Sequence, residues 1–587
     1  MFLTVSRLIS SKYRKQVLII FIFSILLAIS EVLGIASIGP FMALVGSPEA
    51  IYENEYLFMV YSYLDFTNSQ DFLISVGFFV IVLLLFINIF TAFMGWYFSR
   101  FSTRLGHYLS VLLLSSYLNQ PYSFFLNRNT AELGKNLLSE THRIVSGFIA
   151  PAIEIMSKVI VSLLIIGMLV IIDPYAALVC IIGVSSTYLI IYFLFRLVLG
   201  EIGEQSTVSI LKRFKVSNEA MASIKELKLY GKERVFIDKF EKISFLDGGY
   251  SITSNLIAFM PRHILESIIF TVIIFSIILM IDSGRSGPDI IPLLSVYAFA
   301  GYRLMPMLQH IYRAATMMKF NFPAFELLLK DFEEGEVKNH TQPPSLVQEI
   351  SLNSYIELKS ICFSYDSAIK PTLDNVSIRI NHPSKIGIVG KTGSGKTTLV
   401  DVILGLFEPT SGDLIVDGKK ITPENKNAWQ QNLGYVPQDV YLLDDTIEHN
   451  IAFAVTNIDF EKVKKSAKLA GIDEFINSLP AKYNTSVGEK GVRLSGGQLQ
   501  RIGIARALYF DPEVIVFDES TSALDNETER AIMDAINTLS NKKTIIIIAH
   551  RVSTLIGSDA IYELENGKII GIKTYETLQA ELDESKK

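Results

Sequence analysis

Apolar residues gather into six long stretches, separated by polar segments, in the first 318 residues of the chain. Each stretch has roughly the 20 apolar residues that an α-helix needs to cross a bilayer. Asp173 and Pro174 separate the third stretch from the fourth, and we expect a tight turn there because proline begins helices but rarely continues them. The pattern predicts six membrane-spanning helices, at about residues 17–45, 72–98, 144–172, 175–199, 256–281 and 290–318.

The pattern changes after residue 328. A polar connection that includes His340, Pro343 and Pro344 leads to short β-type runs that alternate with helical segments, which is typical of an α/β domain. We therefore predict an α-helical six-span transmembrane domain at 1–328, a linker at 329–354 and an α/β domain at 355–587. The first 15 residues carry four basic side chains, and we expect them to form an amphipathic helix on the membrane surface.

Basic residues lie on one side of the predicted membrane domain. Segment 46–71 and the turn at 173–174 contain no Lys or Arg, and segment 282–289 contains only Arg285. The segments on the other side, between spans two and three and between spans four and five, are rich in Lys and Arg. The positive-inside rule then places both termini and the α/β domain in the cytoplasm. The net charge of the chain is −6, which gives no reason to expect a nucleic-acid partner.

The segment Gly390–Thr397 reads GKTGSGKT and matches the phosphate-binding loop G-x-x-x-x-G-K-[ST] completely. An apolar strand-like run precedes it and a helix-like run follows, as the motif requires. We expect the loop backbone to cradle phosphates, Lys396 to reach the β and γ phosphates, and Thr397 to offer its hydroxyl to Mg²⁺. The predicted nucleotide contacts are Gly390, Lys391, Thr392, Gly393, Ser394, Gly395, Lys396, Thr397 and Thr398.

A second motif ends an apolar strand with two carboxylates, Asp518 and Glu519. We expect Asp518 to hold Mg²⁺ and Glu519 to polarise the attacking water or accept its proton. By itself an acidic end of a buried strand is weak evidence, but it gains weight beside a complete phosphate loop.

A third motif, Leu494-Ser-Gly-Gly-Gln498, completes the set. Together the three resemble the signature of ATP-binding cassette (ABC) proteins, which implies an α/β P-loop nucleotide-binding domain that hydrolyses ATP with Mg²⁺. In that family the third motif faces the ATP held by the other protomer. The resemblance therefore assigns Ser495, Gly496, Gly497 and Gln498 to nucleotide binding.

The resemblance extends to single residues in the order of the family. Tyr365 matches the aromatic residue that stacks on adenine, and Gln438 matches the residue that contacts Mg²⁺ and the membrane domain. Residues 522–525 match the loop that crosses the dimer interface, and His550 matches the histidine that contacts the γ-phosphate. The resemblance implies that Glu519, His550 and Gln438 are catalytic.

Each motif occurs once, so two ATP sites need two chains. A homodimer is the simplest assembly, and a heterodimer is the alternative. The order of the domains and the segment Thr485–Gly491, which contains Glu489, resemble ABC exporters. This resemblance implies a half-transporter that works by alternating access, in the inner (plasma) membrane of a cell.

Arg262 and Arg303 lie within the predicted fifth and sixth spans, at similar depth in the inner half. An arginine within a membrane is costly and usually faces a cavity or a partner, and its guanidinium suits phosphate groups. The alternative is that they reach the inner interface or pair with acids such as Glu266.

Three short segments, 224–231, 261–266 and 302–306, resemble bacterial lipid-linked oligosaccharide flippases. That resemblance implies a polyprenyl-pyrophosphate glycan as the substrate, turned from the inner to the outer leaflet, with Arg262 and Arg303 as contacts. A lipid, multidrug or peptide exporter of the same type is the alternative.

Overall fold

The computed structural model describes most of the chain. The described residues are 11–46, 50–53, 55–66, 68–126, 128–172, 174–264, 266–267, 270–271, 274, 278, 287–334, 350–365, 368, 370–518, 542–549 and 551–585. The chain divides into two compact units. The helical unit comprises Met1–Gln120 and Asn127–Lys338, and the sheet unit comprises Pro121–Leu126 and Asn339–Lys587. We describe each unit by itself.

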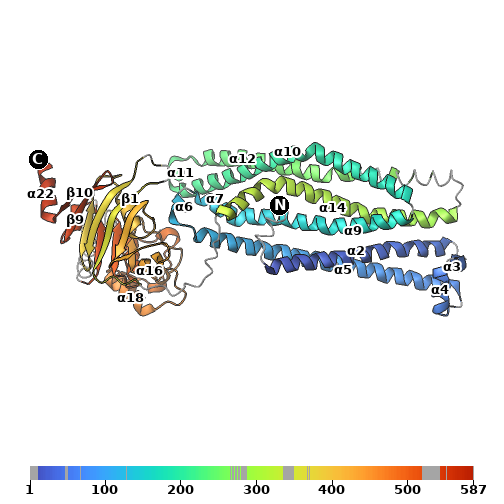
Figure 1. The fold of residues 1–587 in the computed structure, drawn as a ribbon, viewed down its shortest axis with the longest axis horizontal. Coiled ribbons are helices and arrows are strands. Elements are labelled where there is room, and N and C mark those ends of the chain that lie inside the picture. Colours follow the sequence, from blue (N-terminus) through green and yellow to red (C-terminus); the bar gives the residue numbers. More distant parts are fainter. Residues whose placement is uncertain are drawn as a thin grey trace. The chain divides into compact units, whose positions relative to one another are not determined.

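The helical unit is built from long helices. They are α2 (Ser11–Gly46), α5 (Ser69–Leu118), α9 (Ala150–Ile172), α10 (Pro174–Ala222), α12 (Glu233–Phe259) and α14 (Gly287–Glu334). Short helical segments join them: α3 (Ala50–Glu53), α4 (Glu55–Tyr63), α7 (Thr130–Lys135), α8 (Thr141–Ile144) and α11 (Ile224–Tyr230). Two five-residue π-helical segments, η1 (Asn136–Glu140) and η2 (Val145–Ile149), flank α8. Figure 1 shows α10 running beside α12, and α14 beside α9, consistent with their extensive contacts.

Four helices among the described residues are long and apolar enough to cross a membrane: Ser11–Gly46, Ser69–Leu118, Thr130–Ile172 and Ser185–Ala222. They overlap the first four predicted spans. The sixth predicted span, 290–318, lies within α14. Much of the predicted fifth span, 256–281, falls outside the described residues, and so do residues 1–10 of the predicted surface helix; residues 11–15 begin α2.

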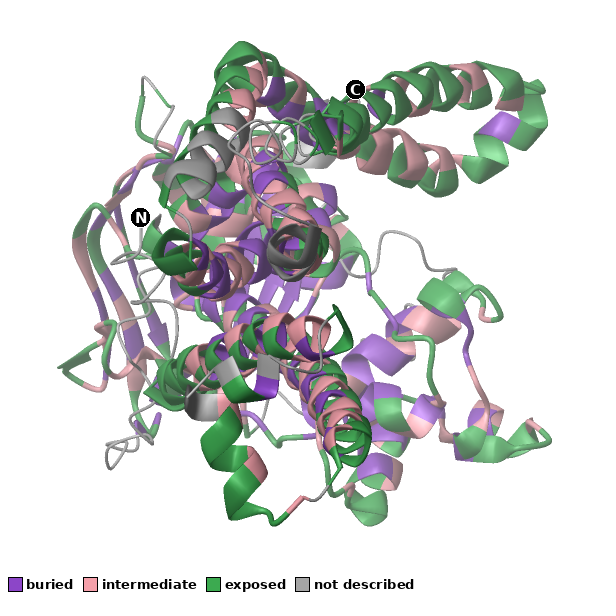
Figure 2. Cartoon of the chain, turned by 90° about the vertical axis from the view of Figure 1, so that its right-hand side faces the viewer, coloured by how far each residue is buried: buried purple, intermediate pink, exposed green. Residues whose placement is uncertain are grey.

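The outer surface of these helices is apolar. On α5, Phe78 and Ile89 expose 63% and 68% of their surface, and large exposed apolar residues recur along the helix. Figure 2 shows that buried residues form the inward stripes of the bundle while the exposed residues face outward. A helix that is apolar on its exposed face is typical of a membrane span, because lipid replaces water there.

Close packing of α2, α9 and α14 forms the centre of the helical unit. Ala28 and Ala300 are fully buried there, together with Ile35, Val161 and Ile165. Small residues let helix backbones approach closely, which is how helices associate within a bilayer. The segment between α2 and α5 was predicted only as an outer connection, but it contains the helices α3 and α4. Tyr61 of α4 packs edge-on against Phe72 of α5.

The sheet unit contains two sheets. The four-stranded sheet has the order β2-β1-β4-β5, formed by β1 (Tyr355–Phe363), β2 (Leu373–Asn381), β4 (Ser411–Val416) and β5 (Lys419–Lys420), all paired antiparallel. The six-stranded sheet has the order β10-β9-β3-β8-β7-β6. Its strands are β3 (Lys385–Val389), β6 (Leu433–Val436), β7 (Val514–Asp518), β8 (Thr544–Ile548), β9 (Ala560–Glu565) and β10 (Lys568–Lys573).

The centre of the six-stranded sheet is parallel. Strands β6, β7, β8, β3 and β9 pair in parallel, and β10 closes one edge antiparallel to β9. Every residue of β7 and β8 is buried, because parallel strands are covered on both faces and therefore have continuously apolar sequences. Parallel strands end at the same edge, so residues that follow β3 and β7 meet there.

Helices cover the sheets of this unit. They are α15 (Lys396–Ile403), α16 (Lys426–Gln430), α17 (Ile447–Ile451), α18 (Phe460–Leu469), α19 (Asp473–Ser478), α20 (Gly496–Leu508) and α22 (Tyr575–Ser585), and α6 (Tyr122–Leu126) belongs to the unit as well. Figure 1 shows the strands gathered together with α16 and α18 beside them. One core contains Ile502 of α20 and Val463 of α18, and the other contains Leu399 of α15 and Trp429 of α16. The α/β class predicted from the sequence is confirmed.

Candidate functional site

The phosphate loop lies between β3 and α15, at the carboxyl edge of the parallel strands. Three of its glycines have positive φ: 156° at Gly390, 79° at Gly393 and 103° at Gly395. At Gly390 a Cβ would also come within 2.2 Å of the carbonyl oxygen of Leu564. The loop therefore needs glycine both for its backbone conformation and for the space that it leaves.

The loop presents donors to an anion. The N-cap residue of α15 is Gly395, which has no side chain to accept from the amides of the first turn. These amides are therefore available to an anion. Lys396 Nζ donates to the carbonyl oxygens of Gly390 and Lys391 at 2.9 and 3.1 Å, which holds the ammonium over the loop. Ser394 Oγ is buried with no hydrogen-bond partner among the described residues. This arrangement fits a polyphosphate, whose oxygens accept from all three kinds of donor.

Asp518 is the last residue of β7 and is 6% exposed. Tyr435, in the neighbouring β6, donates its hydroxyl to Asp518 Oδ2 at 3.1 Å. Burial, and then the charge of Asp518, raise the pKa of Asp401 on α15 to about 6. The carboxyl groups of Asp401 and Asp518 therefore lie close enough for the charge of one to affect the other.

Sequence reasoning did not single out Tyr435 and Asp401. Asp401 follows Thr397 by four residues, so the helical repeat after the phosphate loop could have placed both on one face of α15. Tyr435 gives no such signal, because its contact with Asp518 depends on the pairing of β6 with β7.

The donor set fits Mg²⁺ in the form that accompanies nucleotides. Thr397 is exposed in the first turn of α15 and Asp518 supplies one carboxylate. Mg²⁺ is usually held by one or two protein oxygens together with phosphate oxygens and water. Among the described residues no cluster of three or more His, Cys, Asp or Glu could hold a metal ion.

Tyr365 lies after β1, next to the phosphate loop. Its hydroxyl oxygen is 3.0 Å from Thr398 Oγ1, and 37% of the surface of Tyr365 is exposed. The ring packs edge-on against Phe363 at 5.1 Å and Phe407 at 5.7 Å. A partly exposed ring beside the phosphate loop is where an adenine can stack.

Phe407 also contacts the segment that joins α5 to α7 in the sequence. The ring centroid of Tyr122, the first residue of α6, lies 5.7 Å from that of Phe407. Phe407 is buried and stacks on Phe363 at 4.8 Å. One buried ring thus touches both the predicted adenine-stacking residue and α6.

The signature motif begins α20. Ser495 caps the helix: its Oγ accepts from the amide of Gln498 at 3.3 Å, and Gln498 Oε1 accepts from the amide of Ser495 at 2.9 Å. This reciprocal capping box leaves the Ser495 hydroxyl proton free to donate. Further along α20, Arg506 donates to Asn450 and to the carbonyl of Tyr441, which fixes the helix against α17.

Some of the predicted site residues lie close together in the structure, and others do not. The phosphate loop, Tyr365 and Asp518 belong to one edge of the sheet unit, and Gln438 lies exposed in the loop after β6. Among the described residues no hydrogen bond or ion pair connects Ser495 or Gln498 to the phosphate loop. Glu519, residues 522–525 and His550 lie outside the described residues, and their roles stay predictions.

Both arginines predicted to contact substrate are paired with acids. Arg303 on α14 binds Glu31 on α2 at 3.2 Å; their side chains are 15% and 3% exposed. Arg262, in the helical residues after α12, binds Glu266 at 2.9 Å and keeps 54% of its side chain exposed. The pairing with Glu266, weighed as the alternative from the sequence, is therefore present.

The chain is similar to known transport proteins over most of its length. Residues 17–300 match the ABC transporter transmembrane region, and residues 373–522 match the ABC transporter ATPase domain. An ATP-dependent lipid A-core flippase of Saccharophagus degradans is 30% identical over 79% of this chain and 78% of its own length.

Two further similarities concern part of the sequence and the fold. A Bacillus subtilis protein, provisionally named a multidrug export ATP-binding/permease protein, is 34% identical over 48% of this chain; the match spans about half, 49%, of that relative. The solved structure of a bacterial Atm1-family ABC exporter with ATP bound has a TM-score of 0.78 and 21% identity, covering 97% of this chain and 98% of that one. At that identity it shows the shared fold alone.

Proposed function

Since the chain belongs to the ABC transporter family as an exporter-type half-transporter with an ATP-hydrolysing domain, we propose that two copies of it flip a lipid-linked oligosaccharide. The substrate would be a polyprenyl-pyrophosphate glycan, and the movement would run from the inner to the outer leaflet. ATP binding would close the two nucleotide-binding domains, and hydrolysis would reset them. The chain thus changes between two states that bind substrate and nucleotide differently.

The observation that carries the proposal is the similarity to a lipid A-core flippase over 79% of this chain. So long a match includes much of the membrane domain, where substrate is selected. The name of that relative describes a flippase of an amphiphile with a lipid part and a core part. A glycan on a polyprenyl anchor has the same division into a lipid that stays in the bilayer and a polar head that must cross it.

The two arginines supply a contact for the diphosphate. Arg262 is more than half exposed and its partner Glu266 is only four residues further along the chain, so its guanidinium can turn to an anion without separating distant segments. Arg303 presents a second guanidinium, but Glu31 on α2 holds it. We propose Arg262 as the principal head-group contact and Arg303 as a second contact that Glu31 positions.

The residues of the sheet unit have defined tasks in this proposal. Lys396 and the loop amides hold the phosphates, and Tyr365 holds the adenine. Glu519 polarises the attacking water, Gln438 contacts Mg²⁺ and the membrane domain, and His550 contacts the γ-phosphate. Mg²⁺, held by Thr397 and Asp518, would neutralise phosphate charge. Ser495 of one copy would donate to the γ-phosphate bound by the other, which is why two copies are needed.

The location follows from the charges. The connections rich in Lys and Arg belong on the cytoplasmic side. We propose the cell inner membrane, with both termini and the ATPase domain in the cytoplasm. The segment α6 follows α5 and precedes α7, yet packs within the sheet unit, so it is suited to pass domain closure to the spans.

A multidrug exporter is the second candidate, favoured by the Bacillus subtilis relative. The two candidate functions, glycan-lipid flippase and multidrug exporter, differ in the ligand that should stimulate ATP hydrolysis. The chain would be reconstituted in lipid nanodiscs and its ATPase rate measured with a polyprenyl diphosphate oligosaccharide, with the same lipid lacking sugar, and with a cationic amphiphilic drug. Lys396→Ala gives the background rate.

We expect the glycan lipid to stimulate hydrolysis most, and Arg262→Gln to remove that stimulation while leaving the basal rate. Stimulation by the drug alone would favour the second candidate. Stimulation by none of the three, with the basal rate intact, would move the substrate to another lipid or to a peptide.

A further inference from the structure

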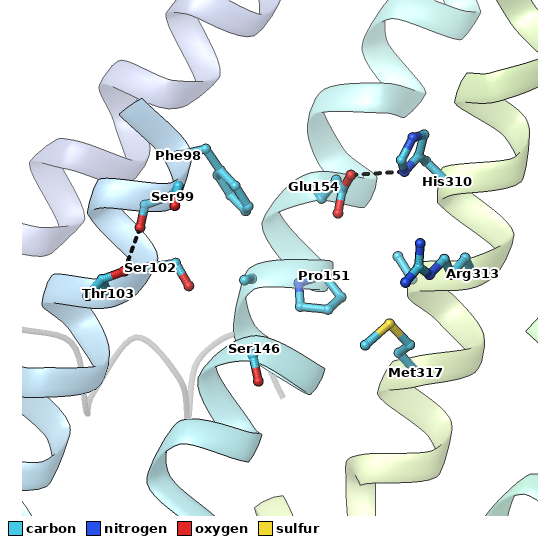
Figure 3. A pocket seen from close by; sticks show the side chains of 12 residues that line it. Phe98, Ser99, Ser102, Thr103, Ser146, Pro151, Glu154, His310, Arg313 and Met317 are labelled. Carbon is cyan, nitrogen blue, oxygen red and sulfur yellow. Dashed lines mark hydrogen bonds and ion pairs between the residues drawn. The ribbon is translucent and has the colours of Figure 1, made fainter. Parts of the chain in front are cut away.

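A pocket of about 380 Å³ lies within the helical unit, between α5, α9 and α14 (Figure 3). Its volume is within the range of small-molecule sites, roughly 300–1,000 Å³. Neither Arg262 nor Arg303 lines it. The pocket is therefore separate from the arginine contacts of the proposed function.

The position of the pocket indicates an amphiphile. On α5, Trp96 is 55% exposed and the guanidinium of Arg100 lies 5.3 Å from its ring. An exposed tryptophan with an adjacent arginine is typical of the membrane–water interface. Phe98 and Ser99, which lie between them in the sequence, line the pocket. A ligand in this pocket would have its polar part near the interface, and an attached tail could remain in the bilayer.

One wall of the pocket is polar but uncharged. Ser99, Ser102 and Thr103 lie along α5, and Phe98 points from the same helix toward α9 in Figure 3. The Thr103 hydroxyl donates to the carbonyl of Ser99 at 3.0 Å, so its lone pairs can still accept. Hydroxyls beside an aromatic ring suit a sugar, whose own hydroxyls donate and accept while its C–H face packs on the ring.

The opposite wall is charged. Glu154 of α9 lies 3.3 Å from His310 of α14, and Arg313 lies one helical turn beyond His310. Figure 3 shows Arg313 reaching from α14 toward Pro151 on α9. One carboxylate facing a guanidinium and an imidazole leaves the pocket neutral or singly positive. The pocket therefore has at least as many basic as acidic groups, so its charge does not exclude an anion.

We propose that this pocket binds the first sugar and the adjoining phosphate of a glycolipid head group before the head group crosses the membrane. Glu154 accepts from sugar hydroxyls, the serines of α5 contact the remaining hydroxyls, and Arg313 with His310 binds a phosphate oxygen. The inference rests on the proposed glycolipid substrate and adds the site that recognises its sugar.

Binding of two probes to the full chain in nanodiscs without nucleotide tests the assignment. The probes are farnesyl diphosphate N-acetylglucosamine and farnesyl diphosphate without sugar. A hydrogen bond to a charged group contributes about a factor of ten in affinity, so we expect Glu154→Gln to weaken only the sugar probe by about tenfold. Arg313→Gln should weaken both probes. Glu326→Gln, an exposed carboxylate further along α14, is the matched control.

Two outcomes of the Glu154→Gln measurement overturn the assignment. Equal affinities of Glu154→Gln and wild type for the sugar probe would show that the carboxylate does not contact sugar. An equal loss for both probes would show a structural role instead. If Glu154→Gln fails to fold, the double variant Ser99→Ala with Ser102→Ala must show the selective loss.

Binding of the sugar probe that no pocket variant changes overturns the pocket and leaves the glycolipid substrate standing. Binding of neither probe by the wild type overturns both.

Discussion

The ring of Tyr122 lies 5.7 Å from the ring of Phe407, so α6 contacts the same buried side chain that supports Tyr365. Tyr122 follows α5 in the sequence, whereas Tyr365 lies beside the phosphate loop. An adenine that stacks on Tyr365 would restrain its ring, and Phe407 is the shared neighbour through which that restraint can reach α6. We propose Phe407 as a residue through which nucleotide binding is coupled to transport.

Tyr122→Ala should separate hydrolysis from transport. An aromatic pair contributes about 0.5–1.5 kcal/mol beyond burial, so its loss should reduce transport per ATP about two- to tenfold while nucleotide affinity stays within a factor of two. Tyr122→Phe keeps the ring and should keep the coupling. The measurement is transport and ATP hydrolysis in the same proteoliposomes. An equal loss of both activities in Tyr122→Ala would show that the pair supports the ATPase fold instead.

Substitutions of Ser495 can separate its cap from its proposed contact with nucleotide. Ser495→Ala removes the acceptor that holds the Gln498 amide, which should cost about 1 kcal/mol of stability, and also removes the donor to phosphate. Ser495→Asp keeps a capping acceptor but has no donor and adds a negative charge. We expect both variants to lose ATPase activity, and only Ser495→Ala to lower the unfolding temperature.

The matching control is Ser495→Thr, whose hydroxyl can both accept from the Gln498 amide and donate to phosphate. This variant should keep the ATPase activity and the unfolding temperature of the wild type. ATPase activity that survives in Ser495→Asp would contradict a donor role for the hydroxyl.

Asp331 on α14 is a buried anion that joins three segments of the helical unit. Its Oδ2 accepts from Tyr117 at 2.7 Å and from Asn136 at 2.8 Å, and its Oδ1 binds Arg128 at 3.0 Å. Asp331→Ala leaves these donors without their acceptor and should cost about 3–5 kcal/mol. Thermal unfolding in detergent measures the effect.

Glu333→Ala provides the comparison for Asp331, since this carboxylate lies two residues away on the same helix and is exposed. It should change stability by less than about 0.5 kcal/mol. Similar unfolding temperatures for the two variants would contradict the structural role of Asp331.

Lys385 makes the stability of the sheet unit depend on pH. It is 2% exposed, its Nζ donates to the carbonyl of Ile556 at 2.6 Å, and burial lowers its pKa to about 8 against the opposing charge of Asp559. The unfolded pKa is about 10.4, so between these values the unfolded chain binds more protons and folding stability rises with pH. Relative to Lys385→Met, the wild type should therefore gain about 2 kcal/mol between pH 7 and pH 9.5.

Unfolding of the full chain at the two pH values measures this difference for Lys385. The cost of Lys385→Met at any single pH also includes the lost hydrogen bond, so only the change of that cost with pH reports the lowered pKa. An equal change in unfolding stability with pH for the wild type and Lys385→Met would contradict a lowered pKa of Lys385.

The sequence predicted the elements whose signals are local. The phosphate loop could be identified because Gly390, Gly393 and Gly395 need positive φ, and β7 and β8 because continuous apolar runs mark buried parallel strands. The helix at α4 was missed, since a short segment with a few aromatic residues has little periodicity.

Contacts between distant segments could not be predicted in the same way. The pair of Arg303 with Glu31 joins residues 272 positions apart, and Tyr122 reaches Phe407 from a different part of the chain. Such pairings depend on how helices and strands pack, and the local sequence pattern of either segment does not indicate its partner. The pocket of Glu154, His310 and Arg313 is unpredictable for the same reason.

ATP-dependent flipping of a fluorescent polyprenyl diphosphate oligosaccharide in proteoliposomes tests the central claim most directly. The wild type, Glu519→Gln and the double variant Arg262→Ala with Arg303→Ala would be compared at equal protein and lipid. We expect flipping by the wild type with ATP, and loss of flipping in both variants. If the wild type hydrolyses ATP but leaves the labelled lipid in its original leaflet, the assignment of a lipid-linked oligosaccharide substrate is contradicted.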